Sequence, residues 1–203
     1  MSFLKKIWQK KRWTTSRFGP AEFNFGVGES EIRETSISIR NYPFEPASVF
    51  PEKKVRAAEI AEIHPDQYPP TFRIGDELIF IGRESVEALL KFAERNDIPA
   101  ARRAANWNWI TEPFLDTEFD QTQQVQTLRL LAKNGILPEE TDELRREIGR
   151  QLHKYNFDTM LWDWMNLGLA DVLAAMHPSL GQEAFRNFYW KAMEIEQRKG
   201  KTS

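Results

Sequence analysis

The 203-residue sequence contains no cysteine. Without a thiol the chain forms no disulfide, no thiolate zinc site, no iron–sulfur cluster and no cysteine nucleophile. The sequence also lacks a phosphate-binding glycine loop, a dinucleotide fingerprint and a Gly-x-Ser-x-Gly elbow, and its three histidines do not have the spacings of helical metal sites. We therefore expect no cofactor and no metal, and a cytoplasmic, bacterial protein.

Long apolar runs are missing as well. The nearest approach is 160–176, where 13 of 17 residues are apolar, and this is shorter than the roughly 18 residues that a membrane span needs. The N-terminus is basic, but no apolar core of a signal peptide follows it. We expect a soluble protein without a transmembrane segment.

Net charge is small, because 28 basic residues nearly balance 30 acidic ones. Overall charge therefore disfavours nucleic acid as a partner. The distribution is uneven: residues 1–17, the basic arm, hold six basic residues and no acidic one, which leaves a net charge of −8 on the remainder. On a helix, four apolar residues of the arm would share one face; they are Phe3, Leu4, Ile7 and Trp8.

Such an arm has three interpretations. It can lie on an anionic membrane, it can contact nucleic-acid phosphates while Trp8 and Trp13 stack on bases, or it can pack on the acidic body of its own chain or on a second subunit. Packing is the favoured interpretation, with the membrane next. The predicted partner-binding or surface-binding residues are Lys5, Lys6, Trp8, Lys10, Lys11 and Arg12.

Proline usage divides the chain near residue 99, since seven of the eleven prolines lie between Pro20 and Pro70. We predict three parts: the arm at 1–18, an α+β domain at 19–99 and a helical bundle at 100–203. In the middle part, 23–27 and 37–39 alternate like half-buried strands. The segment 55–63 suits either a strand or a helix.

A hairpin is predicted at Thr71–Ile81, with Gly75 in its turn. We favour a three-residue loop, which pairs Phe72 with Phe80, because a two-residue loop would set Ile74 opposite Glu77. An amphipathic helix is expected at 83–95, with an apolar face of Val86, Leu89, Leu90 and Ala93.

This order of strands closed by one helix resembles the pleckstrin-homology-like barrel over residues 22–98. The resemblance implies a small antiparallel β domain that binds lipid headgroups or peptides, or that assembles proteins. Fold analogy alone does not establish function.

The last part is predicted to be helical. A short helix at 107–119 is interrupted by Pro113, and a helix at 120–134 has Val125, Leu128, Leu131 and Ala132 on one face and ends in a glycine cap at Gly135. The next helix begins at Pro138 and buries three residues at helical spacing, Leu144, Ile148 and Leu152. A nearly all-apolar helix at 157–176 is expected at the centre of the bundle, and a final one runs from Pro178 to Gly200.

A polar stripe on the expected central helix is the second candidate site. On one continuous helix, Asp163, Asn166 and Asp171 fall on one side, with Trp162 or Trp164 nearby. Two carboxylates can perform acid–base chemistry or hold a ligand. Structural hydrogen bonding within the core is the favoured alternative.

The sequence therefore predicts an α+β, non-enzymatic interaction or adaptor protein that binds a protein partner or a second copy of itself. A peripheral anionic membrane is the second choice of partner. The rival hypothesis is an enzyme or small-ligand receptor built on the polar stripe.

Overall fold

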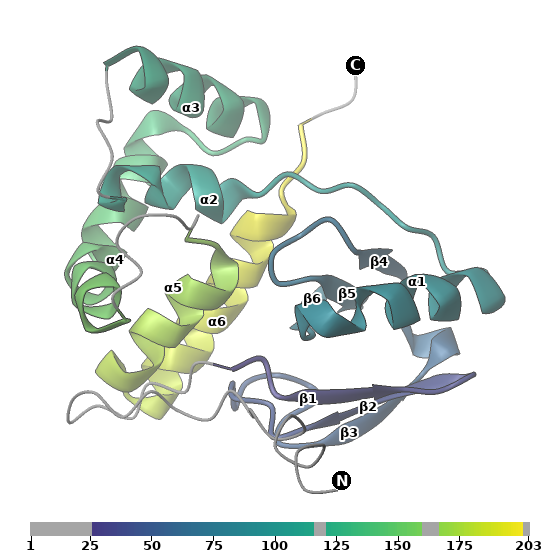
Figure 1. The fold of residues 1–203 in the computed structure, drawn as a ribbon. Coiled ribbons are helices and arrows are strands. Elements are labelled where there is room, and N and C mark those ends of the chain that lie inside the picture. Colours follow the sequence, from purple (N-terminus) through teal and green to yellow (C-terminus); the bar gives the residue numbers. More distant parts are fainter. Residues whose placement is uncertain (1–25, 116–120, 160–166, 201–203) are drawn as a thin grey trace, which may run out of the picture.

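The computed structural model describes residues 26–115, 121–159 and 167–200. Two small antiparallel sheets, three strands each, are followed by a series of helices (Figure 1). The predicted α+β class is confirmed. The basic arm lies outside the described residues.

The first sheet is a meander of β1 (Glu29–Ile32), β2 (Ser36–Arg40) and β3 (Lys53–Arg56). Ile37 and Ile39 on β2 and Val55 on β3 are buried, as the alternation at 37–39 predicts. The strand expected at 23–27 is wrong for residues 26–27, and 23–25 lie outside the described residues. Gly28 has a φ of 76°, and a Cβ there would lie 2.7 Å from the Arg40 carbonyl oxygen.

The second sheet orders β4 (Glu62–His64), β5 (Thr71–Ile74) and β6 (Glu77–Phe80) as another meander. The ambiguous segment 55–63 is neither one strand nor one helix. It contains the end of β3, a 3-10 turn at Ala57–Glu59 and the start of β4.

The predicted β5–β6 hairpin is present, but its loop was predicted wrongly. Only Gly75, with a φ of 55°, and Asp76 lie between the strands, so that Ile74 pairs with Glu77. A positive φ at the first loop residue suits the tight turn of a two-residue hairpin. The sequence disfavours a pair of Ile74 with Glu77 because a carboxylate interrupts the apolar face, but in the structure Glu77 is buried and hydrogen-bonded.

Helix α1 (Val86–Arg95) follows β6 after a 3-10 turn at Arg83–Ser85, as predicted. Leu89 and Ala93 are buried, whereas Leu90, which was expected on the same face, is 43% exposed. Beyond α1, residues 99–101 lie parallel to β4, with the Ile63 N–H donating to the Pro99 oxygen at 2.9 Å and the Ala101 N–H to the Ile63 oxygen at 2.9 Å.

Five further α-helices follow in the part of the chain that the structure describes. They are α2 (Asn106–Thr111), α3 (Gln121–Lys133), α4 (Pro138–Thr159), α5 (Leu169–Met176) and α6 (Gln182–Gln197). The α3–α4 connection is as predicted: Gly135 has a φ of 78°, and the Ile136 N–H donates to the Leu131 oxygen at 3.0 Å. The predicted face of α3 is wrong in part, because Leu131 is buried but Val125 and Ala132 are exposed.

The helix predicted at 157–176 is also wrong. Helix α4 continues to Thr159, and a separate helix, α5, begins at Leu169 after Gly168. The final helix α6 buries Phe185, Phe188, Ala192 and Ile195, as expected. It begins at Gln182 rather than at Pro178, which lies in a separate 3-10 turn, and it ends at Gln197 rather than at Gly200.

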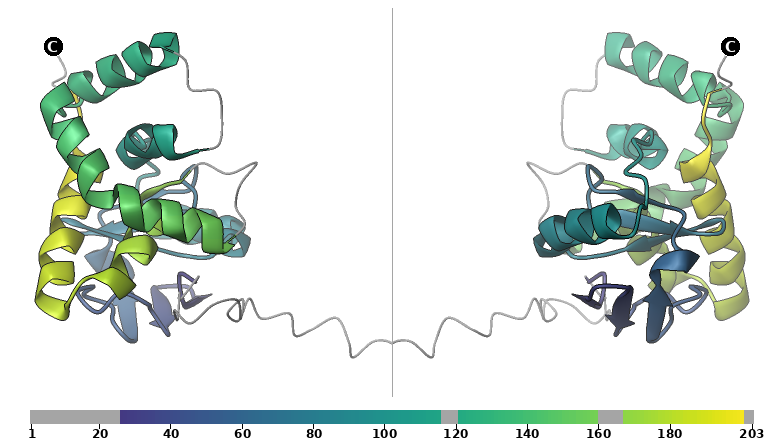
Figure 2. Two further views of the ribbon diagram at one scale, coloured as in Figure 1. Left: turned by 90° about the vertical axis from the view of Figure 1, so that its left-hand side faces the viewer. Right: turned by 90° about the vertical axis from the view of Figure 1, so that its right-hand side faces the viewer.

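One continuous cluster of buried apolar side chains extends from the sheets into the helices. Phe44, in the β2–β3 connection, is central to it, since its ring lies 6.2 Å from the rings of Phe80, Phe185 and Tyr189. In Figures 1 and 2 the sheets and α1 lie together against one side of the helices. The domain boundaries at 18 and 99 stay a prediction.

Candidate functional site

Most residues of the two predicted sites lie outside the described part of the chain. This holds for the whole basic arm, including Lys5, Lys6, Trp8, Lys10, Lys11 and Arg12. It holds too for Trp162, Asp163, Trp164 and Asn166. Of both sets, only Asp171 is described.

Asp171 lies in the first turn of α5. Its carboxylate accepts the Gly168 N–H at 2.9 Å and the Tyr155 hydroxyl at 3.2 Å. Burial raises the pKa of Asp171, and these two hydrogen bonds act in the opposite direction. The carboxylate therefore satisfies the amino end of α5, which is the structural alternative to a reactive group. A helix that starts at Leu169 also removes the basis for one stripe through 163, 166 and 171.

A buried carboxylate that the sequence analysis missed joins the second sheet to α6. Glu77 is 2% exposed and accepts the Tyr189 hydroxyl at 2.7 Å and the Ser48 N–H at 3.1 Å. Tyr42 lies in the same cluster, where its hydroxyl accepts the Phe80 N–H at 3.2 Å. Burial, together with the nearby Glu77, raises the pKa of Tyr42 and of Tyr189, so both phenols stay protonated. Glu77 thus holds the hairpin against α6.

A buried ion pair forms a second junction. The Arg103 and Glu196 side chains are each 3% exposed, and Nη1 of the first lies 2.8 Å from Oε1 of the second. The other carboxylate oxygen of Glu196 accepts the Trp107 N–H at 2.9 Å. Next to it, the Asn106 amide donates to the Ile195 oxygen and accepts from Asn134, each at 2.8 Å. These bonds anchor the amino end of α2 and the α3–α4 turn to the end of α6.

His64 is the third buried polar group, at 1% exposure. Its Nδ1 lies 3.0 Å from the Thr71 hydroxyl, and Nε2 lies 3.4 Å from the Glu62 carboxylate. Burial and the charge of Arg103 lower the pKa of His64 to about 4, although Glu62 acts in the opposite direction. The ring is therefore neutral near pH 7. Since it is closed to solvent, we assign it a structural part.

Chemistry at a metal receives no support from the described ranges, in which no three His, Asp or Glu side chains gather as metal ligands. Among the helices of residues 26–115, 121–159 and 167–200, none is both long and apolar enough to cross a membrane.

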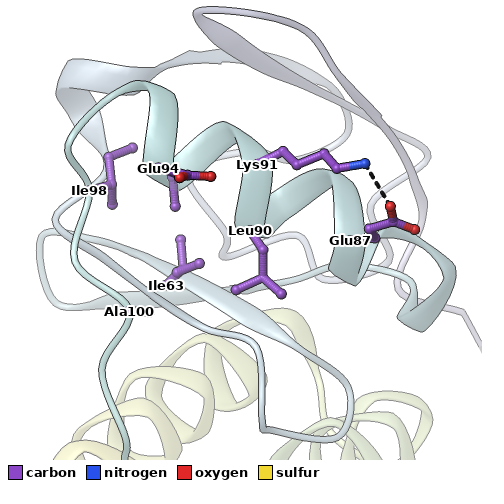
Figure 3. A pocket seen from close by; sticks show the side chains of 8 residues that line it. Ile63, Glu87, Leu90, Lys91, Glu94, Ile98 and Ala100 are labelled. Atoms are coloured by element: carbon purple, nitrogen blue, oxygen red, sulfur yellow. Dashed lines mark hydrogen bonds and ion pairs between the residues drawn. The ribbon is translucent and has the colours of Figure 1, made fainter.

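The remaining candidate is a groove between α1 and the edge of the second sheet, here called the α1 groove. It has a volume of about 410 Å³. Its lining is formed by Ile63, Glu87, Leu90, Lys91, Ala93, Glu94, Ile98 and Ala100. In Figure 3 the Leu90 side chain points from α1 toward the strand that carries Ile63. The groove is thus apolar inside, with charged residues on the helix side.

The charges of the α1 groove are unequal. Lys91 Nζ lies 2.6 Å from the Glu87 carboxylate, so the one ammonium group of the lining is paired. Glu94 is exposed and forms no ion pair with any residue that the structure describes. The rim therefore carries a net negative charge of one, with Glu94 available to a cation.

Backbone groups along one side of the α1 groove are also available. The residues on both sides of Ala100 bond to Ile63 of β4, so the Ala100 N–H and C=O point away from the sheet. Within the described ranges no backbone partner of the Ala100 N–H is found. An unpaired edge of this kind can accept one more strand.

Sequence reasoning did not find the α1 groove. One signal was present: Leu90 immediately follows Leu89, and adjacent side chains on a helix point about 100° apart, so burial of one does not require burial of the other. The contact between residues 99–101 and β4 joins positions 37 apart and leaves no local pattern.

The fold and the site define a mixed α+β protein with a shallow apolar groove beside an open sheet edge. Comparison of the chain with protein-family models, with curated proteins and with solved structures finds no match. The resemblance of residues 22–98 to the pleckstrin-homology-like barrel stays a prediction.

Proposed function

We propose that this protein is a non-enzymatic interaction module that binds a short extended segment of a partner protein in the α1 groove. The observation that carries the proposal is the exposed Leu90 above an apolar floor, next to the unpaired backbone edge at Ala100.

The chemistry of the groove favours a peptide over a small polar substrate. An extended segment added beside residues 99–101 would bond to the Ala100 N–H and C=O and direct alternate side chains into the groove. Its apolar side chains would cover Leu90 and Ile98, and a basic residue would face Glu94. Main-chain hydrogen bonds then supply affinity and the side chains supply specificity.

The enzyme or small-ligand receptor of the rival hypothesis receives no comparable support. The single described member of its residue set, Asp171, is engaged by Gly168 and Tyr155. A cytoplasmic location, inferred from the absence of cysteine, and the pleckstrin-homology-like resemblance are further parts of the proposal.

Selection from a display library of random 12-residue peptides tests the proposal, with the full chain as bait. Peptides that bind the wild type are then measured against Leu90→Asp, which places a charge in the groove. The matched control is Leu137→Asp, because Leu137 is 58% exposed and lies between α3 and α4, far along the chain from the groove.

Enriched peptides that lose at least tenfold in affinity with Leu90→Asp, and keep it with Leu137→Asp, support the proposal; by the usual conversion this loss is about 1.4 kcal/mol. A selection that yields no binder, or binders that both variants retain equally, contradicts it. The Ala100 amide signal in a ¹⁵N spectrum must also move when a selected peptide binds.

A further inference from the structure

The basic arm has the most one-sided charge of the sequence, and the proposed function assigns it no role. It combines six basic residues with the apolar Phe3, Leu4, Ile7 and Trp8. A segment of this composition has the two properties that the α1 groove selects, namely apolar side chains and positive charge.

We propose that the basic arm of the same chain is the first occupant of the α1 groove, where it competes with the partner segment. The inference rests on the proposed function, because it assigns a second ligand to the same groove. The arm would then act as an internal competitor that a better-fitting partner displaces.

The path of the chain allows this contact. Strand β1 starts beside the beginning of α1, since the Ser30 and Ser85 hydroxyl oxygens lie 3.1 Å apart. The chain that precedes β1 therefore arrives near the first turn of the helix that forms one wall of the groove. Seventeen residues separate Trp8 from Gly26. They can span up to roughly 60 Å, whereas α1 is only about 15 Å long.

Charge supports the same pairing. The arm is the strongly basic part of a chain whose remainder has a net charge of −8. At the groove, Glu87 already binds Lys91, so Glu94 is the carboxylate that an arm lysine would meet. Surface charges attract modestly and are screened by salt, so the contact must weaken as ionic strength rises.

Apolar contact adds to the charge attraction between the arm and the groove. Ile63 and Ile98 are buried at the floor of the groove, and Leu90 stands exposed at its side (Figure 3). Covering Leu90 with Ile7 or Trp8 would remove apolar surface of both from water. A tethered segment does this at a high effective concentration, so even a weak contact keeps the groove occupied.

A spin label tests the contact directly in the full chain. Because the natural sequence contains no cysteine, Ser2→Cys provides a single attachment point for a nitroxide. The broadening of amide signals in the ¹⁵N-labelled protein is measured at low and high salt. The amides of Leu90, Lys91 and Ala100 report on the groove, and the chemically reduced label gives the reference.

We expect broadening at these three amides that is lost with Leu90→Asp and reduced with Glu94→Lys. The matched controls are Leu137→Asp and Glu183→Lys, which change an exposed leucine and an exposed glutamate elsewhere and should leave the broadening unchanged. Broadening that is absent from the groove, or that survives Leu90→Asp, overturns the proposal.

A mixture of ¹⁴N spin-labelled chains with unlabelled ¹⁵N chains tests whether the arm of a second copy causes the broadening. Groove broadening of full size in that mixture shows exchange between chains and overturns the assignment to the same chain. An arm that leaves the groove amides untouched but sediments the protein with anionic vesicles assigns it to a membrane, which also overturns the proposal.

Competition separates this inference from the proposed function. A selected peptide should bind the full-chain variant Ile7→Asp/Trp8→Asp roughly two- to tenfold more tightly than the wild type, because the internal competitor is weakened. Equal affinity overturns the arm proposal and leaves the proposed function standing. If no selected peptide depends on Leu90, the proposed function itself fails, whatever the arm does.

Discussion

The second sheet meets two very different neighbours. Toward α6 it is sealed by buried polar groups, of which Glu77 and Tyr189 are in hydrogen-bond contact at 2.7 Å. Toward α1 it keeps an open groove with an exposed leucine, Leu90, and with a carboxylate, Glu94, that forms no ion pair among the described residues. Buried charge is costly unless it is partnered, so the α6 side must be structural, whereas exposed apolar surface beside free backbone groups suits binding.

Among the polar contacts of the sealed side, the largest expected loss of stability is in the ion pair of Arg103 with Glu196. Arg103→Met leaves the buried Glu196 without its cation, and we expect the free energy of unfolding to fall by roughly 3–5 kcal/mol. Urea denaturation measures it. The double variant Arg103→Met/Glu196→Gln should recover part of the loss, because neither buried charge remains. A single variant as stable as the wild type would contradict the assignment.

Glu77→Ala should rank second. It leaves the Tyr189 hydroxyl and the Ser48 N–H without their buried acceptor. Each orphaned group costs about 1–3 kcal/mol, so we expect a loss of roughly 3 kcal/mol in urea denaturation. Glu87→Ala on the exposed face of α1 is the control and should leave stability nearly unchanged, because exposed ion pairs contribute little. Equal effects of the two substitutions would contradict the proposed difference between the α6 side and the α1 side of the second sheet.

Stability should also fall in mild acid through His64. Its pKa is about 4 in the folded chain against 6.5 in its ordinary state, so the unfolded chain binds the proton more readily. The contribution is complete above pH 6.5 and is lost as the pH falls from 6.5 toward 4. Between pH 7 and pH 5 we expect a loss of about 2 kcal/mol. His64→Gln should lack this part of the pH dependence, and an unchanged slope would contradict the prediction.

A smaller effect is expected away from both neighbours, at the α3–α4 turn. Gly135 has a φ of 78°, and a Cβ there would meet no atom within 4 Å. Gly135→Ala should therefore cost only the backbone strain of the left-handed conformation, about 1–2 kcal/mol in thermal or urea unfolding. Gly135→Asn should cost less, since asparagine tolerates that conformation. Equal losses would point to a steric clash instead.

The smallest effect on stability is expected at the open side. Leu90→Asp should alter the free energy of unfolding by no more than about 0.5 kcal/mol, as is usual for an exposed position. Leu89→Asp, one residue earlier and fully buried, should prevent folding. If Leu90→Asp is as damaging as its neighbour, the groove is part of the core and not a binding surface.

Features that depend on neighbouring residues were predictable from the sequence. The Asn134-Gly135 cap, the buried stripe of α4 and the helix after β6 all follow from spacing within one or two turns. The number of residues in the β5–β6 loop was not predictable in this way. It depends on Tyr189, which is 112 positions from Glu77 and makes a buried carboxylate acceptable there.

The break in the predicted central helix has a local cause that composition concealed. Apolar residues continue on both sides of Gly168, but Asp171 accepts the Gly168 N–H and starts a new helix. Of the candidate site, the sequence predicted only an interaction module. The sheet edge that lines the groove was hidden, since Ile63 and Ala100 meet only in the folded chain.

Helix α6 is the last of the described elements to leave the ribosome, yet it supplies the partners of Glu77 and Arg103. Until it emerges, a nascent chain lacks the Tyr189 hydroxyl and the Glu196 carboxylate that these two side chains bind. Completion of the core during synthesis must therefore wait for nearly the whole polypeptide. A stalled or prematurely terminated translation product that ends before residue 189 would present an unfinished sheet to quality-control proteases.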